Sequence, residues 1–252
     1  MVMAEAGALA GRDRGPRERA EDAACRQRMG ASRYASHLLG RSAAHLALAR
    51  WLPEPVHIRT EVLRGPLGQP TAVACNASVA EVTLSHSGGW ACALVSDPGR
   101  PFGIDLEERA PATAATARKS LARTGQWKHG PGPGISDDLM ALAAWTAREA
   151  AGKALKTGLA VASEVLDVET VDPGDDGTYD VRFRRLPMLR GTTCFLDDVV
   201  VSFATFLRHG ARVQMTPLPP GGTPMSAHHY FWRLDALRES RVEHHEHTFI
   251  SP

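Results

Sequence analysis

Residues 103–108 read GIDLEE, a strand-like stretch that carries three acidic residues. It follows the apolar segment LSHSGGWACALVS (84–96) and a Pro/Gly connector, so we expect it to form a β-strand. Side chains at i and i+2 of a strand share a face, which places Asp105 beside Glu107. Adjacent carboxylates repel each other, and a divalent cation such as Mg²⁺ removes that repulsion. The alternative is a solvated strand edge whose charges only block aggregation.

The segment WTAREAAGKAL (145–155) carries an acid and a base on one face of a predicted helix. Trp145, Glu149 and Lys153 are each four residues apart, so they form one stripe. Small residues beside the stripe allow another element to approach closely. Glu149 could then be a third oxygen ligand, and Lys153 a point charge on an anion. A core tryptophan beside an ordinary ion pair is the alternative.

The segment LSHSGG (84–89) places Ser85 and His86 just before a Gly-Gly turn. Hydroxyl, imidazole and exposed turn amides are all donors suited to phosphate. A hairpin turn with an incidental histidine is the alternative. The spacing alone does not decide between the two.

The order of elements predicts two similar halves. A helix is expected over 33–52, ended by Pro53, and it is followed by short strands. Helices are expected again over 111–124 and from Asp137, after an N-cap at Ser136, followed by three strand-like segments. We therefore predict an α+β fold of two pseudo-symmetric halves, each a long helix on a small, mostly antiparallel sheet, with the site in the cleft between them. The predicted regions are a mobile extension (1–30), an N-terminal half (31–101), a C-terminal half (102–212) and a tail (213–252).

Composition excludes several classes of protein. The 252 residues carry a net charge of +1, which argues against bulk electrostatic binding of nucleic acid or membrane. No apolar run approaches the ~20 residues of a membrane span, and the first residues lack the apolar stretch of a secretory signal. The four cysteines are widely spaced, so we expect free thiols and a cytoplasmic protein.

Together, SHSG, GIDLE and WTAREAAGKAL occur in the order typical of the 4′-phosphopantetheinyl transferases. The chain resembles the two-halved monomeric branch of that family, the surfactin-synthetase-activating type, over roughly residues 30–207. GIDLE matches at every position, and WTAREAAGKAL differs only in Arg148, where lysine is commoner. LGQP (67–70) resembles the family's Gly-Lys-Pro turn, with Gln69 in place of a lysine that binds a phosphate of coenzyme A.

The resemblance implies a reaction. A serine of an acyl or peptidyl carrier protein attacks the β-phosphate of coenzyme A, takes the phosphopantetheine arm and releases 3′,5′-ADP. The base would be Glu149 or a water on the cation. The implied roles are Mg²⁺ ligation by Asp105, Glu107 and Glu149, catalysis by Glu149 and Lys153, and coenzyme binding by Ser85, His86, Lys153, Arg33, Arg41 and Gln69.

Two other functions remain open at this point: a non-catalytic relative that binds coenzyme A or a carrier protein, and a Mg²⁺-dependent hydrolase that cleaves a diphosphate. The chain also departs from the family, because no acid stands near Arg123–Gln126, where many relatives carry a further glutamate. A chain that holds both halves can complete its own cleft, so we expect a monomer.

Two charged segments lie outside these motifs. ARKSLAR (117–123) places Arg118, Lys119 and Arg123 on a short helix, which could dock an acidic carrier or could be only a solvated basic face. The histidines of the tail lack the spacing of a zinc site, so we expect incidental surface residues.

Overall fold

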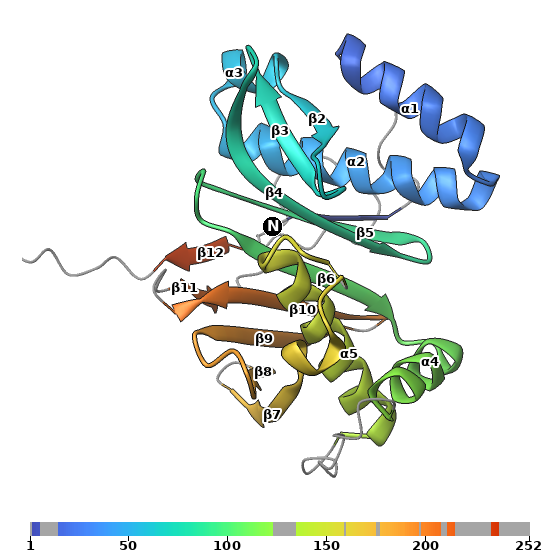
Figure 1. Cartoon of the computed structure of the whole chain (residues 1–252), viewed down its shortest axis with the longest axis vertical. Coiled ribbons are helices and arrows are strands. Elements are labelled where there is room, and N and C mark those ends of the chain that lie inside the picture. The colour runs from blue at the N-terminus through green and yellow to red at the C-terminus, as the bar shows by residue number, and fades with distance from the viewer. Residues whose placement is uncertain are drawn as a thin grey trace, which may run out of the picture.

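The computed structural model describes residues 15–122, 135–158, 160–174, 177–196 and 198–207, together with the backbone of 2–5, 211–214 and 233–236. These residues form an α+β fold in which two five-stranded antiparallel sheets each carry a long helix (Figure 1). The predicted fold class is confirmed. The position of the missing glutamate and the tail histidines lie outside the described residues.

The N-terminal half is a sheet with strand order β1-β5-β4-β3-β2, covered by the helix α2. Helix α2 packs a stripe of small and aliphatic side chains on the sheet, among them Leu39, Ala43 and Leu48. Its elements are β1 (Val2–Glu5), α1 (Pro16–Arg28), α2 (Ala31–Trp51), α3 (Glu54–Ile58), β2 (Glu61–Arg64), β3 (Pro70–Ala74), β4 (Ala77–Ser87) and β5 (Trp90–Ser96).

The C-terminal half is a sheet with strand order β6-β10-β9-β8-β7, covered by the helix α5. Its elements are β6 (Phe102–Glu108), α4 (Pro111–Ala122), α5 (Asp137–Ala154), the 3₁₀ helix η1 (Ser163–Leu166), β7 (Val168–Pro173), β8 (Thr178–Phe183), β9 (Leu189–Phe195) and β10 (Val199–Phe206). A separate two-stranded sheet joins β11 (Ala211–Gln214) to β12 (Arg233–Ala236). Strand β11 crosses the predicted boundary between the C-terminal half and the tail, and β12 lies within the tail.

The two halves repeat one topology. Each begins with a strand, continues through a long helix and ends in a four-stranded meander, and in each the first strand pairs with the last. Strand β1 occupies the same position in the first sheet as β6 does in the second.

Local sequence explains the ends of both long helices. Helix α2 ends two residues before Pro53, which cannot continue a helix. Helix α5 begins after Ser136, whose hydroxyl accepts a hydrogen bond from the Leu139 amide at 3.3 Å, as predicted from the N-cap pattern. The four cysteines are free thiols, also as predicted.

The predicted mobile extension is wrong for residues 16–28, which form the helix α1. Glu18 of this helix is fully buried, and its carboxylate contacts the imidazole of His45 at 2.8 Å and accepts from the amide of Val62 at 3.1 Å. A charge buried in this way needs such partners. Because those partners come from α2 and β2, the pattern of residues 1–30 alone could not reveal the helix's docking.

A third apolar cluster joins the halves. It combines Cys92 and Leu94 of β5 with Ile104 and Leu106 of β6 and with Phe203 of β10, all buried. Strand β6 therefore belongs to the second sheet by hydrogen bonding and packs against the first sheet by its side chains. Figure 1 shows β6 lying beside β4 and β5 where the halves meet.

Candidate active site

Two strands place hydroxyl and carboxylate groups face to face at the junction of the halves. Ser85 and Ser87 lie two residues apart on β4, and Asp105 and Glu107 lie two residues apart on β6. The Ser85 hydroxyl donates to Asp105 Oδ1 at 2.7 Å, and the Ser87 hydroxyl donates to Glu107 Oε2 at 2.6 Å. Both carboxylates therefore project to the same side of β6, as the strand period predicted.

Helix α5 brings a cation to this pair of carboxylates. Lys153 Nζ lies 2.7 Å from Asp105 Oδ1, so Asp105 is held by an ammonium and by the Ser85 hydroxyl. The approach of α5 to β6 depends on Gly103, because a Cβ at that position would collide with the backbone carbonyl of Ala150. Glycine is required here for close packing, which explains the first residue of the GIDLEE stretch.

Glu149 is the third carboxylate of the site. It is half-buried, and its pKa is raised from 4.5 to about 7, first by burial and then by the negative charge of Asp105, with a smaller effect from Glu107. The pKa of Glu107 is also raised, mainly by burial, and Asp105 contributes. The electrostatic effect of each carboxylate on its neighbours shows that all three share one environment, although they come from two elements.

The protonation of Glu149 gives a testable pH dependence. Its pKa is 4.5 in a free side chain and about 7 here, so the folded state binds the proton more tightly than the unfolded chain. This contribution to stability is present at low pH and is lost as the pH rises from about 4.5 through about 7. With a chelator present to remove divalent cations, the variant Glu149→Gln should not show this loss. In the wild type the loss of free energy of unfolding should be on the order of 2 kcal/mol, after allowance for partial solvation.

Urea unfolding of both proteins between about pH 5 and pH 8 measures this difference. The wild type should lose more free energy of unfolding than the Gln variant across that range. Parallel stability curves for the two proteins would show that Glu149 keeps an ordinary pKa.

The carboxylates do not form a ready-made metal cage in this conformation. Within the described ranges, no group of three or more His, Cys, Asp or Glu side chains is arranged to hold a metal ion. The chemistry of the site nevertheless suits a divalent cation, because Asp105 Oδ2 is buried without a hydrogen-bond partner, and burial together with the negative charge of Asp105 raises the pKa of Glu149 to about 7. A cation among these oxygens would satisfy the first and ionise the second.

The structure places the other predicted coenzyme ligands in different surroundings. His86 follows Ser85 on β4, and its pKa is lowered first by partial burial and then by the positive charge of Lys153. Arg33 is exposed in the first turn of α2. Arg41 is buried and donates to Glu21 at 2.8 Å, so it helps to dock α1 on α2. Phosphate binding by either arginine stays a prediction.

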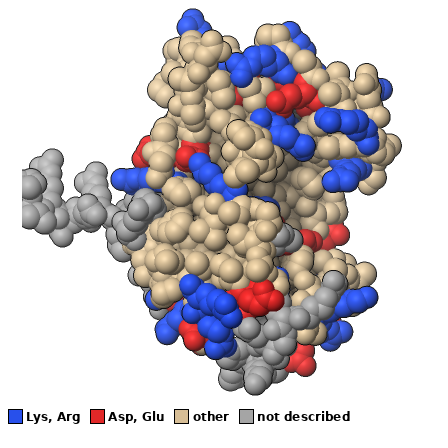
Figure 2. Space-filling view, viewed as in Figure 1, with Lys and Arg blue, Asp and Glu red and all other residues tan. Residues whose placement is uncertain are grey.

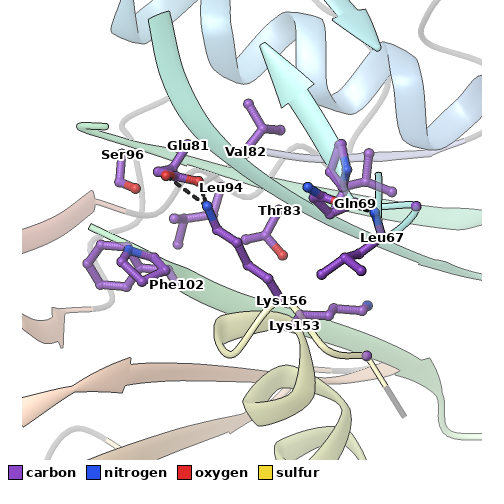
Figure 3. Close-up of a pocket in the computed structure, with 15 residues that line it drawn as sticks. Leu67, Gln69, Glu81, Val82, Thr83, Leu94, Ser96, Phe102, Lys153 and Lys156 are labelled. Carbon is purple, nitrogen blue, oxygen red and sulfur yellow. Dashed lines mark hydrogen bonds and ion pairs between the residues drawn. The ribbon is translucent and has the colours of Figure 1, made fainter. Parts of the chain in front are cut away.

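A pocket of about 260 Å³ opens beside Lys153, between β4 and the end of α5 (Figure 3). Its wall includes Gln69, whose side-chain oxygen accepts from the Leu67 amide at 2.9 Å. Figure 3 shows Lys156 extending from the end of α5 across the pocket to Glu81 of β4. The rest of the lining is mostly apolar, with contributions from Pro70, Val82, Leu84, Leu94, Pro101 and Phe102.

Sequence reasoning missed two residues here. The Ser87 hydroxyl donates a hydrogen bond to Glu107. Ser87 could have been predicted to lie on the same face as Ser85, because it follows Ser85 by two residues on a predicted strand. Lys156 lines the pocket, and no local pattern indicated it, because it follows the helix in a turn.

The comparisons with known proteins do not add a family assignment. No protein-family model matches the chain, and no curated protein matches it. In the part of the chain that the structure describes, no helix is both long enough and apolar enough to cross a membrane.

Proposed function

We propose that this protein transfers the 4′-phosphopantetheine arm of coenzyme A to a serine of an acyl or peptidyl carrier protein. The observation that carries this proposal is the meeting of Asp105, Glu107, Glu149 and Lys153 at the junction of two topologically equivalent halves. These four residues are the ones to which the resemblance to phosphopantetheinyl transferases gives the central roles. Three carboxylates and one ammonium beside a pocket suit a diphosphate and its cation.

The metal would be Mg²⁺, held by Asp105, Glu107 and Glu149, and it would withdraw negative charge from the diphosphate during cleavage. Lys153 supplies a fixed positive charge at the same place, since its ammonium already lies on Asp105 at 2.7 Å. A phosphate oxygen that displaces Asp105 from Lys153 would gain a charge-assisted hydrogen bond. Ser85 and His86 add donors on the β4 side.

Glu149 is suited to accept the proton of the attacking serine. With the cation bound, the Glu149 carboxylate would be ionised at neutral pH, so it could take that proton. In the reaction, the serine oxygen forms a bond to the β-phosphorus as the bond from that phosphorus to the bridging oxygen breaks. The serine proton passes to Glu149, and 3′,5′-ADP leaves with the bridging oxygen and its electron pair.

The direct test incubates the protein with coenzyme A, Mg²⁺ and an apo carrier protein and measures the carrier's mass. A gain of one phosphopantetheine group supports the proposal. Binding of coenzyme A without a gain in mass would point to a non-catalytic relative. Loss of coenzyme A without a modified carrier would point to a hydrolase.

Recognition of the carrier should depend on local charges, because basic and acidic side chains are interspersed over the face shown in Figure 2. Helix α4 buries Ala114, Ala117 and Leu121 and leaves Arg118 and Lys119 exposed. Arg118 is partly neutralised by Asp138 at 2.7 Å, which leaves Lys119 as the more available cation. Arg123, the third member of the predicted basic group, lies outside the described residues.

Reversing both charges of α4 tests the docking hypothesis. The double variant Arg118→Glu, Lys119→Glu should raise the KM for an acidic carrier about 10-fold through lost charge complementarity, while the KM for coenzyme A stays unchanged. Steady-state kinetics with each substrate varied in turn measures both constants. The matched control is Arg182→Glu on the exposed side of β8. An unchanged carrier KM in the double variant would discard the hypothesis.

A further inference from the structure

Ser87 is the last residue of β4, and its hydroxyl lies between two residues of β6. The hydroxyl donates to Glu107 Oε2 at 2.6 Å, and its oxygen accepts from the Glu108 amide at 3.4 Å. An amide N–H can only donate and an ionised carboxylate can only accept, so the single proton of the hydroxyl is committed to Glu107. The backbone of β6 therefore fixes the direction of this short hydrogen bond.

The two carboxylates of β6 are held by different kinds of donor. Asp105 Oδ1 accepts from the Lys153 ammonium and from the Ser85 hydroxyl, each at 2.7 Å, so a cationic partner already balances part of its charge. Glu107 accepts from the Ser87 hydroxyl, which carries no charge. A neutral donor fixes the position of a carboxylate without forming an ion pair with it. Glu107 is therefore oriented and still has its charge to offer to a cation.

Orientation matters for a glutamate ligand because its side chain is long and flexible. A cation that binds a freely rotating glutamate must meet the entropy cost of fixing that side chain. Glu107 is only half-buried, so packing alone does not fix it. The indole of Trp145 interacts with the same carboxylate more weakly than the Ser87 hydroxyl does. The hydrogen bond from Ser87 thus places Glu107 before a cation arrives.

We propose that Ser87 is a positioning residue, whose hydroxyl orients Glu107 as a ligand of the divalent cation. This inference rests on the proposed function, which requires that cation. Ser87 belongs to the N-terminal sheet, whereas Asp105, Glu107 and Glu149 all belong to the C-terminal half. The affinity for the cation therefore depends on both halves, although one half supplies all three carboxylates. Groups that orient a metal ligand in this way change metal affinity by about 10- to 100-fold.

The competing role for Ser87 is a purely structural tie between the β4–β5 hairpin and β6. The structure supplies such a tie without Ser87, because Glu108 Oε1 accepts from the Gly89 amide at 3.2 Å. The turn also packs closely on β6 at Gly88, where φ is +55° and a Cβ would collide with the Glu108 carboxylate. Loss of the Ser87 hydroxyl should therefore leave the hairpin in place.

Binding of Mn²⁺ in the presence of coenzyme A, measured from the electron paramagnetic resonance signal of the free ion, separates these roles. Ser87→Ala should weaken Mn²⁺ binding about 10-fold. Ser87→Thr keeps the hydroxyl and should restore binding. Ser78→Ala, exposed at the other end of β4, is the matched control and should bind as the wild type does.

The transfer reaction gives a second readout. Ser87→Ala should need about 10-fold more Mg²⁺ for half of its maximal rate. At saturating Mg²⁺ its kcat should be close to that of the wild type, because the hydroxyl acts through Glu107 and takes no part in bond making or breaking.

An unchanged Mn²⁺ affinity in Ser87→Ala would overturn the proposal and leave Ser87 as a structural tie, as would an equal loss in Ser87→Thr. The wild-type protein would still transfer phosphopantetheine in either case, so the proposed function would stand. Failure of the wild type to bind Mn²⁺ with coenzyme A present would instead contradict the proposed function, and this inference would fall with it.

Discussion

Replacing Asp105 with asparagine should lower the rate of phosphopantetheine transfer about 1000-fold or more. Asp105 is buried, and one of its oxygens holds both Lys153 and Ser85 at 2.7 Å. Asparagine keeps the shape but removes the charge, so the cation would lose a ligand and Lys153 would lose its partner. The loss should be seen in kcat at saturating coenzyme A and Mg²⁺.

The fold should survive this substitution, since an amide oxygen can still accept the hydrogen bond from Ser85. Circular dichroism and a thermal melt check that point. Asp180→Asn, on the exposed side of β8, is the matched control and should leave the rate unchanged. A rate for Asp105→Asn within a few-fold of the wild type would remove Asp105 from the catalytic centre.

Replacing Gly103 with alanine should destabilise the protein by about 3 kcal/mol or more, a large part of the stability of an ordinary domain. The added Cβ would overlap the carbonyl oxygen of Ala150 and approach the amide of Ala154, both in the backbone of α5. Backbone atoms cannot move aside as the end of a flexible side chain can. Helix α5 would have to shift away from β6, which would also separate Lys153 from Asp105.

Chemical unfolding of the purified variant, or its failure to accumulate as folded protein, measures this effect. Gly89→Ala is the matched control, because a Cβ there meets nothing within 4 Å. A Gly103→Ala protein as stable as the control variant would show that α5 does not pack on β6 as closely as described.

Much of the fold could be predicted because its signals are local. The long helices have apolar stripes, a serine N-cap before α5 and a proline after α2, and the strand β6 places Asp105 and Glu107 by its period alone. The first strand and helix α1 could not be predicted in the same way. The strand β1 finds its partner in β5, and the buried Glu18 of α1 finds its partners in α2 and β2.

In the candidate site, too, the residues with local sequence signals could be predicted, and those that depend on distant partners could not. Glu149 and Lys153 were predicted from helical spacing, and their meeting with Asp105 required only that α5 pack on β6. Lys156 could not be predicted as a pocket residue, because its partner Glu81 lies on the opposite wall of the pocket and is distant in the sequence. Arg41 was predicted to bind phosphate, and the structure pairs it with Glu21 of a helix that had not been predicted.

The most direct test of the central claim locates the cation itself. Crystals of the protein grown with coenzyme A and Mn²⁺, an anomalous scatterer that takes the place of Mg²⁺, would show where the metal binds. We expect an anomalous peak among the carboxylates of Asp105, Glu107 and Glu149, in contact with the diphosphate. A coenzyme bound elsewhere, or a metal on other carboxylates with these three left apart, would contradict it.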